Sequence, residues 1–519
     1  MGRVVIAIDA GTTGVRALAL DEQARVGDVA YRELTQHFPR PGWVEHDPAE
    51  IWEAVRATLA EVGGRLAGAG DTVAAIGITN QRETLVAFNR STGLPLHRAI
   101  VWQDRRTAAL CAELTEAGHL PLVRATTGLV LDPYFSATKA AWLLRHGDLA
   151  LAPDSPYLSF CTVDTWVLWN LTGGAGGTGG GTYATDPSNA SRTLLLDTAT
   201  LSWSPELCDL FGVPPHTLPE VRPSAGRFGT ATLSDLGPAS AVLDGVPVSG
   251  VLGDQQAALF GQACFEPGMV KVTYGTGSFA LANVGPERPR APDGLTVSCA
   301  WDLGDHADDA QGRLAYALEG SAFVSGAAVQ WLRDGLGIIS TAAEVGPLAA
   351  SVPDSGGVTF VPALTGLGSP WWDPRARGIV TGLTRGAGRA QLARACVEGI
   401  AFQVRDMTDA MAAASARPLS ALRADGGAAA MDLLLELQAE QSRMSVARPR
   451  SLESTARGAA TVAGLAEGVW TSLGELAALW QAERTFEPQL APELADATYA
   501  VWRRVVEKSM GWAELGAGS

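Results

Sequence analysis

Two aspartates follow apolar segments that have the pattern of buried strands. Asp9 ends the β-branched run that begins at Arg3, and Asp254 follows residues 250–253 at a glycine-bearing corner that leads into an apolar helix. Strand ends that lead into helices are where α/β proteins place their chemistry. A carboxylate there can take a proton or hold a divalent cation through water. The alternative interpretation of Asp254 is a helix N-cap, the usual role of an aspartate at such a corner.

Two short turns combine glycine with hydroxyl-bearing residues. The first, residues 10–14 (AGTTG), separates two predicted strands, and the second, residues 275–278 (GTGS), follows a predicted strand over 268–274. Backbone N–H groups in such turns can hold phosphate oxygens. Taken alone, the first turn is equally well explained as a plain β-hairpin. Because a comparable turn recurs about 265 residues later, the two halves of the chain each open with a phosphate-sized hairpin.

Arg82 and Glu83 belong to the run Asn80-Gln81-Arg82-Glu83 at the end of another predicted strand, Val73 to Thr79. A guanidinium and a carboxylate side by side can donate to and accept from the hydroxyls of one small polyol. The alternative is a surface ion pair, worth about 0–1 kcal/mol. Trp102 stands at the end of a strand-like segment and Tyr134 precedes a helix over 136–146, so each is either part of the core or the wall of a pocket.

The second half of the chain carries further elements that suit a flat ligand. A helix predicted over 322–333 places Gly326 and Gln330 four residues apart, on one face. The glycine pair at 426–427 follows a short strand and lets the backbone approach a ligand closely. A long helix is predicted over 389–414, and the tail from about Leu473 is expected to be helical and to pack on the second domain. The glycine-rich stretch 173–181 lacks the ending of a phosphate loop and is interpreted as a flexible connection.

Length and composition limit the class of protein. A chain of 519 residues exceeds what one hydrophobic core supports, so two domains are expected. The net charge of −16 disfavours general binding to nucleic acid or to anionic membranes. Six cysteines spread singly argue against a zinc site or a disulfide framework. With no export signal and no long apolar run, we expect a cytoplasmic protein without membrane insertion.

Six segments together closely resemble the glycerol kinases of the FGGY family of carbohydrate kinases. They are DAGTT (9–13), GITNQRET (77–84), AIVWQ (99–103), GLVLDPYFS (128–136), GDQQAALFG (253–261) and YGTG (274–277). The resemblance runs essentially from end to end. It implies an α/β fold of two ribonuclease-H-like (actin-type ATPase) domains flanking a central catalytic cleft. The expected domains are residues 1–257, with the polyol site, phosphate hairpin and metal site, and residues 258–519, with the adenosine site.

The resemblance also implies an activity and roles for individual residues. The implied reaction is phosphorylation of glycerol to sn-glycerol 3-phosphate with ATP and Mg²⁺, and Asp254 is the implied general base. The residues implied to hold glycerol are Arg82, Glu83, Trp102, Tyr134, Asp254, Gln255 and Phe279. The residues implied to bind the nucleotide are Thr12, Thr13, Gly14, Arg16, Thr276, Gly326, Gln330, Gly427 and Met431. The carboxylates implied to face the metal are Asp9 and Asp254.

Two positions depart from the pattern of the family. Met431 stands where an asparagine is usual near the adenine, and Gly14-Val15 replaces a serine pair. These departures keep open a nucleotide-binding regulator without activity, and a kinase for another small polyol or ketose is the second alternative. The sequence does not distinguish a homodimer from a homotetramer.

Overall fold

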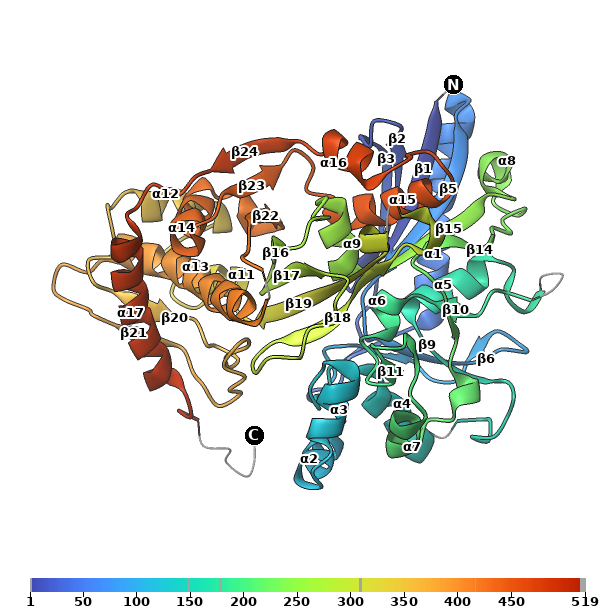
Figure 1. The fold of residues 1–519 in the computed structure, drawn as a ribbon, viewed down its shortest axis with the longest axis horizontal. Helices are drawn as coiled ribbons and strands as arrows, with labels where there is room; N and C mark the ends of the chain where they lie inside the picture. The colour runs from blue at the N-terminus through green and yellow to red at the C-terminus, as the bar shows by residue number, and fades with distance from the viewer. Residues whose placement is uncertain (1, 148, 177–179, 308–309, 416, 514–519) are drawn as a thin grey trace.

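The computed structural model describes residues 2–147, 149–176, 180–307, 310–415 and 417–513. Two large mixed sheets organise the chain (Figure 1). The six-stranded sheet has the order β14-β15-β5-β1-β2-β3, and the seven-stranded sheet has the order β18-β19-β17-β16-β22-β23-β24. The strands of the first sheet are β1 (Arg3–Ala10), β2 (Gly14–Asp21), β3 (Val26–Glu33), β5 (Thr72–Asn80), β14 (Ala225–Thr230) and β15 (Pro247–Gly253). Those of the second are β16 (Met269–Tyr274), β17 (Ser278–Gly285), β18 (Thr296–Asp302), β19 (Leu314–Ala322), β22 (Ala421–Asp425), β23 (Val446–Pro449) and β24 (Ala482–Phe486).

Both sheets are built around the same arrangement of strands. In the first sheet β1 pairs with β2 as an antiparallel hairpin and with β5 in parallel. In the second sheet β16 pairs with β17 as an antiparallel hairpin and with β22 in parallel. Each sheet therefore places a hairpin turn beside the end of a parallel strand, where α/β proteins bind ligands.

Strand β1 is buried on both faces of its sheet. Val4, Ile6 and Ile8 pack into the core on one face, whereas Val5 and Ala7 pack into the core on the other. Successive side chains of a strand point to opposite faces, so an unbroken apolar run fits a sheet that is covered on both sides.

Helix α1 (Pro48–Ala69) covers one face of the first sheet and begins as its sequence predicts. Asp47 caps it by accepting a hydrogen bond from the N–H of Ala49 at 2.8 Å, and Pro48 takes the first helical position. Gly70, with φ of 74°, ends the helix in the left-handed conformation. The apolar stripe between these caps is buried against the sheet.

The other face of the first sheet is covered by α9 (Asp254–Gly261) and α15 (Ser454–Ala466). Figure 1 shows α15, close to the C-terminal end of the colour scale, lying beside the earliest strands. A Cβ atom on Gly77 of β5 would lie 2.0 Å from the carbonyl oxygen of Ala459, so the backbone of α15 rests directly on the sheet. A segment of the expected second domain thus completes the sheet of the first, and the expected boundary at 257/258 falls within α9.

A third sheet of short strands extends from the first half of the chain. It contains β4 (Glu45–His46), β6 (Leu85–Asn89), β7 (Leu94–Pro95), β8 (Ala99–Ile100) and β9 (Leu158–Thr162). The helices that follow these strands are α2 (Ala108–Glu116), α3 (Leu120–Thr127), α4 (Ser136–His146), α5 (Val163–Leu171), α6 (Pro187–Ala190) and α7 (Pro205–Phe211). This part carries Trp102 and Tyr134, and the turn that leads into α4 brings Tyr134 toward Arg192.

Several helices surround the second sheet, and two expectations about them are corrected. The helices are α11 (Gly326–Asp334), α12 (Val345–Ala350), α13 (Arg389–Ala414), α14 (Asp432–Ser442), α16 (Leu473–Leu479) and α17 (Pro492–Ser509). The start predicted at Ala322 for α11 is wrong, because Ala322 ends β19, which pairs with both β17 and β18. The tail is not wholly helical, since β24 lies between α16 and α17 and pairs with β23.

Two further expectations concern a loop and the membrane. The glycine-rich stretch 173–181 contains a single 3₁₀ turn, Gly174–Gly176, and its residues 177–179 lie outside the described ranges. Within those ranges, no helix has both the length and the apolar character that a membrane crossing requires.

Candidate active site

The turns of the two hairpins present hydroxyl groups at the ends of β1 and β16. The N–H of Gly11 donates to the carbonyl of Gly14 at 3.0 Å, and the N–H of Gly275 donates to the carbonyl of Gly277 at 2.8 Å. These bonds close each turn, while Thr13 and Thr276 remain exposed. Accessible hydroxyls and backbone amides in such turns suit the oxygens of a phosphate chain.

The glycine at position 14 is explained by its neighbour on β3. A Cβ atom on Gly14 would lie 2.3 Å from the hydroxyl of Tyr31, which donates to the carbonyl of Thr13 at 3.1 Å. The place of a serine side chain at this position is therefore occupied by the phenol of Tyr31.

Asp254 is the first residue of α9, directly after the last strand residue Gly253. One carboxylate oxygen, Oδ1, lies 3.2 Å from Nε of Arg82 and accepts a hydrogen bond from the N–H of Gln255 at 2.7 Å. The side chain thus faces Arg82 as well as the first turn of its own helix, and it remains 30% exposed. Burial raises the pKa of Asp254, and the nearby charges of Arg82 and Lys271 oppose that rise.

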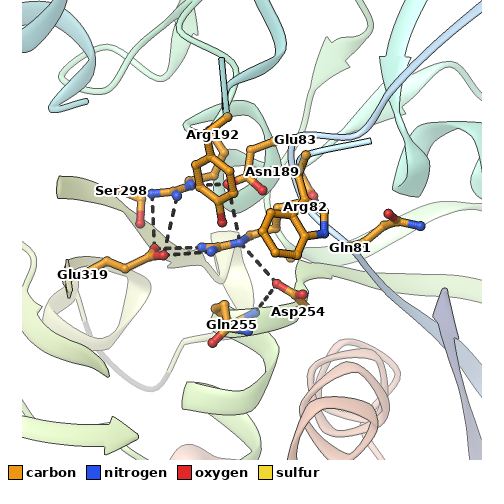
Figure 2. A network of polar contacts seen from close by, with 12 residues as sticks. Gln81, Arg82, Glu83, Asn189, Arg192, Asp254, Gln255, Ser298 and Glu319 are labelled. Carbon is orange, nitrogen blue, oxygen red and sulfur yellow. Dashed lines mark hydrogen bonds and ion pairs between the residues drawn. The ribbon is translucent and has the colours of Figure 1, made fainter. Parts of the chain in front are cut away.

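Arg82 joins Asp254 to a buried cluster of ion pairs (Figure 2). Its two terminal nitrogens donate to the two oxygens of Glu319 at 2.8 Å each. Arg192 donates through Nε to Glu83 at 2.6 Å and lies 3.1 Å from Glu319 through Nη1. Since these four side chains are no more than 2% exposed, Arg82 and Glu83 are not a surface pair.

The charges of this cluster depend on one another. Burial alone would raise the pKa of Glu319, but Arg192 and Arg82 hold it at about 2. Burial raises the pKa of Glu83 despite the same two arginines. Within the described residues, Nε of Arg82 has no hydrogen-bond partner of good geometry, so a buried N–H faces the site and can donate to a ligand.

Aromatic side chains lie beside the cluster. The indole N–H of Trp102 donates to the hydroxyl of Thr12 at 2.9 Å, which ties it to the first hairpin turn. The rings of Trp102 and Tyr134 meet edge to face at 5.6 Å, and the guanidinium of Arg192 lies 5.4 Å from the Tyr134 ring. Phe279 lies on β17, opposite Ser321 of β19, and is partly exposed.

A separate pocket of about 730 Å³ lies within the second half of the chain. It lies between the Gly275 turn, α11, α12 and the 427–433 segment. Five of the residues expected to bind the nucleotide line it together: Thr276, Gly326, Gln330, Gly427 and Met431. A pocket of this volume accommodates a ligand of nucleoside size.

Arg16, expected near the phosphates, and Asp9, expected near the metal, each lie close to other charged side chains. Arg16 of β2 forms an ion pair with Glu453. The pKa of Asp9 is raised to about 7, mainly by burial and further by the charges of Asp254 and Glu453, while Arg16 opposes the rise. Apart from Phe279, the expected site residues thus lie in two groups, around Arg82 with the first hairpin, and in the pocket of the second half.

The sequence reasoning did not identify Arg192, Glu319 and Lys271, which complete the polar site. Arg192 follows α6 with no motif to mark it. Glu319 and Lys271 each stand alone within an apolar strand, and both are buried. A single charge in such a strand is the signal that could have found them, because buried charges require partners.

The chain is similar in sequence to a family of known proteins. Models of the FGGY family of carbohydrate kinases match its N-terminal domain to residues 4–261 and its C-terminal domain to residues 270–467. The chain is 51% identical to a glycerol kinase of Thermus brockianus over 516 residues, covering 99% of this chain and 100% of that protein. It is 50% identical to a glycerol kinase of Aromatoleum aromaticum over 513 residues, covering 98% and 99%.

The fold is also similar to the solved structures of two kinases. The crystal structure of Plasmodium falciparum glycerol kinase with ADP superposes with a TM-score of 0.90 at 31% identity and covers 98% of each chain. A xylulose kinase of Rhodospirillum rubrum gives a TM-score of 0.83 at 24% identity, covering 98% of this chain and 99% of that one, and shares the fold.

Proposed function

The chain belongs to the FGGY family of carbohydrate kinases, and from this membership we propose that it phosphorylates glycerol with ATP to give sn-glycerol 3-phosphate. The observation that carries the proposal is identity of about one half with glycerol kinases over nearly the whole chain. The buried Arg82-Glu83 pair beside Asp254 supports it, because these polar groups match the hydroxyls of a small polyol.

In the proposed reaction Asp254 is the general base. It takes the proton of the terminal glycerol hydroxyl as that oxygen bonds to the γ-phosphorus, and the bond from phosphorus to the β,γ-bridging oxygen breaks to release ADP. The glycerol hydroxyls are held by Arg82, Glu83, Tyr134 and Gln255, and the carbon side faces Trp102 and Phe279. The raised pKa of Asp254 makes its carboxylate a stronger base than an exposed aspartate.

The nucleotide is assigned to the two hairpins and the 730 Å³ pocket. Thr12, Thr13, Gly14 and Arg16 meet the β- and γ-phosphates from the first half, and Thr276 meets them from the second. Gly326, Gln330, Gly427 and Met431 border the adenosine. Their shared lining of one pocket supports this assignment.

The carboxylates of Asp9 and Asp254 fit a Mg²⁺ ion. Burial raises the pKa of both groups, and the charge of Asp254 further raises that of Asp9, so a bound divalent cation would favour the charged form of these carboxylates. Mg²⁺ is usually bound in kinases by one or two carboxylates, with water and substrate phosphates as its other ligands, and Asp9 and Asp254 would supply those carboxylates. When bound, the ion neutralises phosphate charge.

A panel of substrates in an ADP-release assay tests the proposed function. With ATP and Mg²⁺, we expect the highest kcat/KM for glycerol, above xylitol, erythritol, xylulose and ribulose. A higher value for any sugar or longer polyol would assign the chain to the other kinase class. ATP binding measured by calorimetry without ADP release for any of these compounds would instead indicate a regulator.

The pocket of the second half gives a further prediction. A Cβ atom on Gly326 would lie 2.6 Å from the carbonyl oxygen of Gly275, so Gly326→Ala is expected to push α11 from the second hairpin turn. We expect the KM for ATP to rise about tenfold while the calorimetric Kd for glycerol without nucleotide stays unchanged. Gly64→Ala on α1, where a Cβ meets no atom within 4 Å, is the control. An unchanged KM for ATP would contradict this placement of the nucleotide.

A further inference from the structure

Lysine is rare in this chain, and one of its two buried lysines, Lys271, contacts the side chain of Gln255 in the polyol site. Of the 39 basic residues, only Lys139, Lys271 and Lys508 are lysines. Lys271 lies in β16 between two valines and is 0% exposed. Burying an ammonium group is unfavourable unless partners surround it, so the contacts of Lys271 explain its position.

The Lys271 ammonium contacts residues on both sides of the junction between the two halves. Nζ donates to Oε1 of Gln255 on α9 and, at 2.8 Å, to the hydroxyl of Thr273 on its own strand. Thr273 in turn donates to Asp425 at 2.5 Å. Burial lowers the pKa of Lys271, while the carboxylates of Asp425, Asp254 and Glu319 favour its charged form.

This contact determines which end of the Gln255 amide faces the site. An ammonium group can only donate hydrogen bonds, so the amide must present its carbonyl oxygen to Lys271. The NH₂ group of the partly exposed Gln255 is then directed away from Lys271 and donates to no other group within the described residues, so it can donate to a ligand. Without the lysine, both orientations of the amide are open to Gln255.

We propose that Lys271 is a positioning residue of the polyol site, which holds the Gln255 carbonyl so that the Gln255 NH₂ donates to a substrate hydroxyl oxygen. This inference rests on the proposed function. It assigns a direction to one substrate hydrogen bond, because the hydroxyl oxygen accepts from Gln255 and its proton remains available to a carboxylate.

A double-mutant cycle on glycerol binding, measured by calorimetry without nucleotide, tests the proposal. We expect Lys271→Met and Gln255→Ala each to weaken glycerol binding about tenfold, the usual cost of one hydrogen bond to an uncharged group. If Lys271 acts through Gln255, the double variant will bind glycerol no more weakly than Gln255→Ala alone. Additive losses, about a hundredfold in total, would overturn the proposal.

A second variant avoids the removal of the buried charge. Gln255→Glu keeps an acceptor for Lys271 but has no NH₂ group, so we expect unchanged or higher thermal stability with glycerol binding about tenfold weaker. Glycerol binding equal to wild type would show that the Gln255 NH₂ does not donate to substrate. Tyr316→Phe, which removes a buried hydrogen bond to the carbonyl of Thr198 away from the site, is the control and should leave the glycerol Kd unchanged.

The wild-type protein separates this inference from the proposed function. If wild type neither binds glycerol nor releases ADP in its presence, the proposed function fails and the inference fails with it. If wild type does both and the cycle is additive, only the role of Lys271 is wrong.

Discussion

Asp254→Asn is expected to lower kcat for glycerol phosphorylation by ~10²–10⁴-fold, the usual effect of losing a general base. Asparagine has nearly the same shape, but its amide cannot take the proton of the attacking hydroxyl. Because Asp254 is 30% exposed and lies 3.2 Å from Arg82, the substitution removes a reactive group without opening a cavity. The measurement is ADP release at saturating glycerol and ATP.

The control for this prediction is Asp197→Asn. Like Asp254, Asp197 accepts a backbone N–H from a residue that follows it, Ala199 at 2.9 Å, but it ends a two-residue strand, Leu196–Asp197, just before a turn. We expect unchanged turnover for this variant and similar melting temperatures for both. Near-normal turnover of Asp254→Asn would exclude Asp254 as the base.

Glu319→Ala is expected to destabilise the protein by about 3–5 kcal/mol, the usual effect of removing one partner from a buried ion pair. The substitution removes one of the two carboxylates that both Arg82 and Arg192 contact, so two buried guanidinium groups then share Glu83 alone within this cluster. Because Arg82 loses its orientation, we also expect a higher KM for glycerol. Urea unfolding followed by tryptophan fluorescence measures the first effect, and ADP release measures the second.

The control is Asp235→Ala, which breaks an exposed ion pair with Arg56 and should cost at most about 1 kcal/mol. The pairing of Glu319 also predicts a pH dependence. Since its pKa is about 2 in the folded protein against an ordinary value of 4.5, its stabilisation is present above pH 4.5 and is lost as the pH falls toward 2. Equal stabilities of Glu319→Ala and Asp235→Ala would contradict the role assigned to the cluster.

Local patterns predicted much of the fold. The helices over 136–146 and 389–414 begin and end as expected, because apolar spacing is a local property of the sequence. The helix expected from Ala322 was wrong at its start, since the segment 314–322 pairs with strands on both sides and this pairing outweighs helical spacing. The strand within the tail, β24, was missed for a similar reason. It is a strand because it pairs with β23, and this pairing cannot be inferred from the local sequence of the tail.

The residues of the candidate site also differ in whether the sequence alone could identify them. Arg82 and Asp254 could be identified from the sequence because each follows a strand in a recognisable motif. Arg192 could not, because its importance depends on contacts such as that with Glu83, made across more than a hundred residues of chain. The lone charge of Glu319 in an apolar strand marks it as buried, but its partner Arg82 is equally remote along the chain. The roles of all these residues stay predictions until the variants are measured.

The position of α15 on the first sheet has a consequence for synthesis of the protein on the ribosome. The last strand of that sheet to be made, β15, ends at Gly253, but the helix that covers one of its faces begins only at Ser454. Until that helix emerges, the apolar side chains of Val5, Ala7 and Leu252 have no complete cover on this face. The nascent N-terminal half therefore stays unfinished and vulnerable to aggregation, and the strands that carry Asp9 and precede Asp254 gain their final support almost at the end of translation.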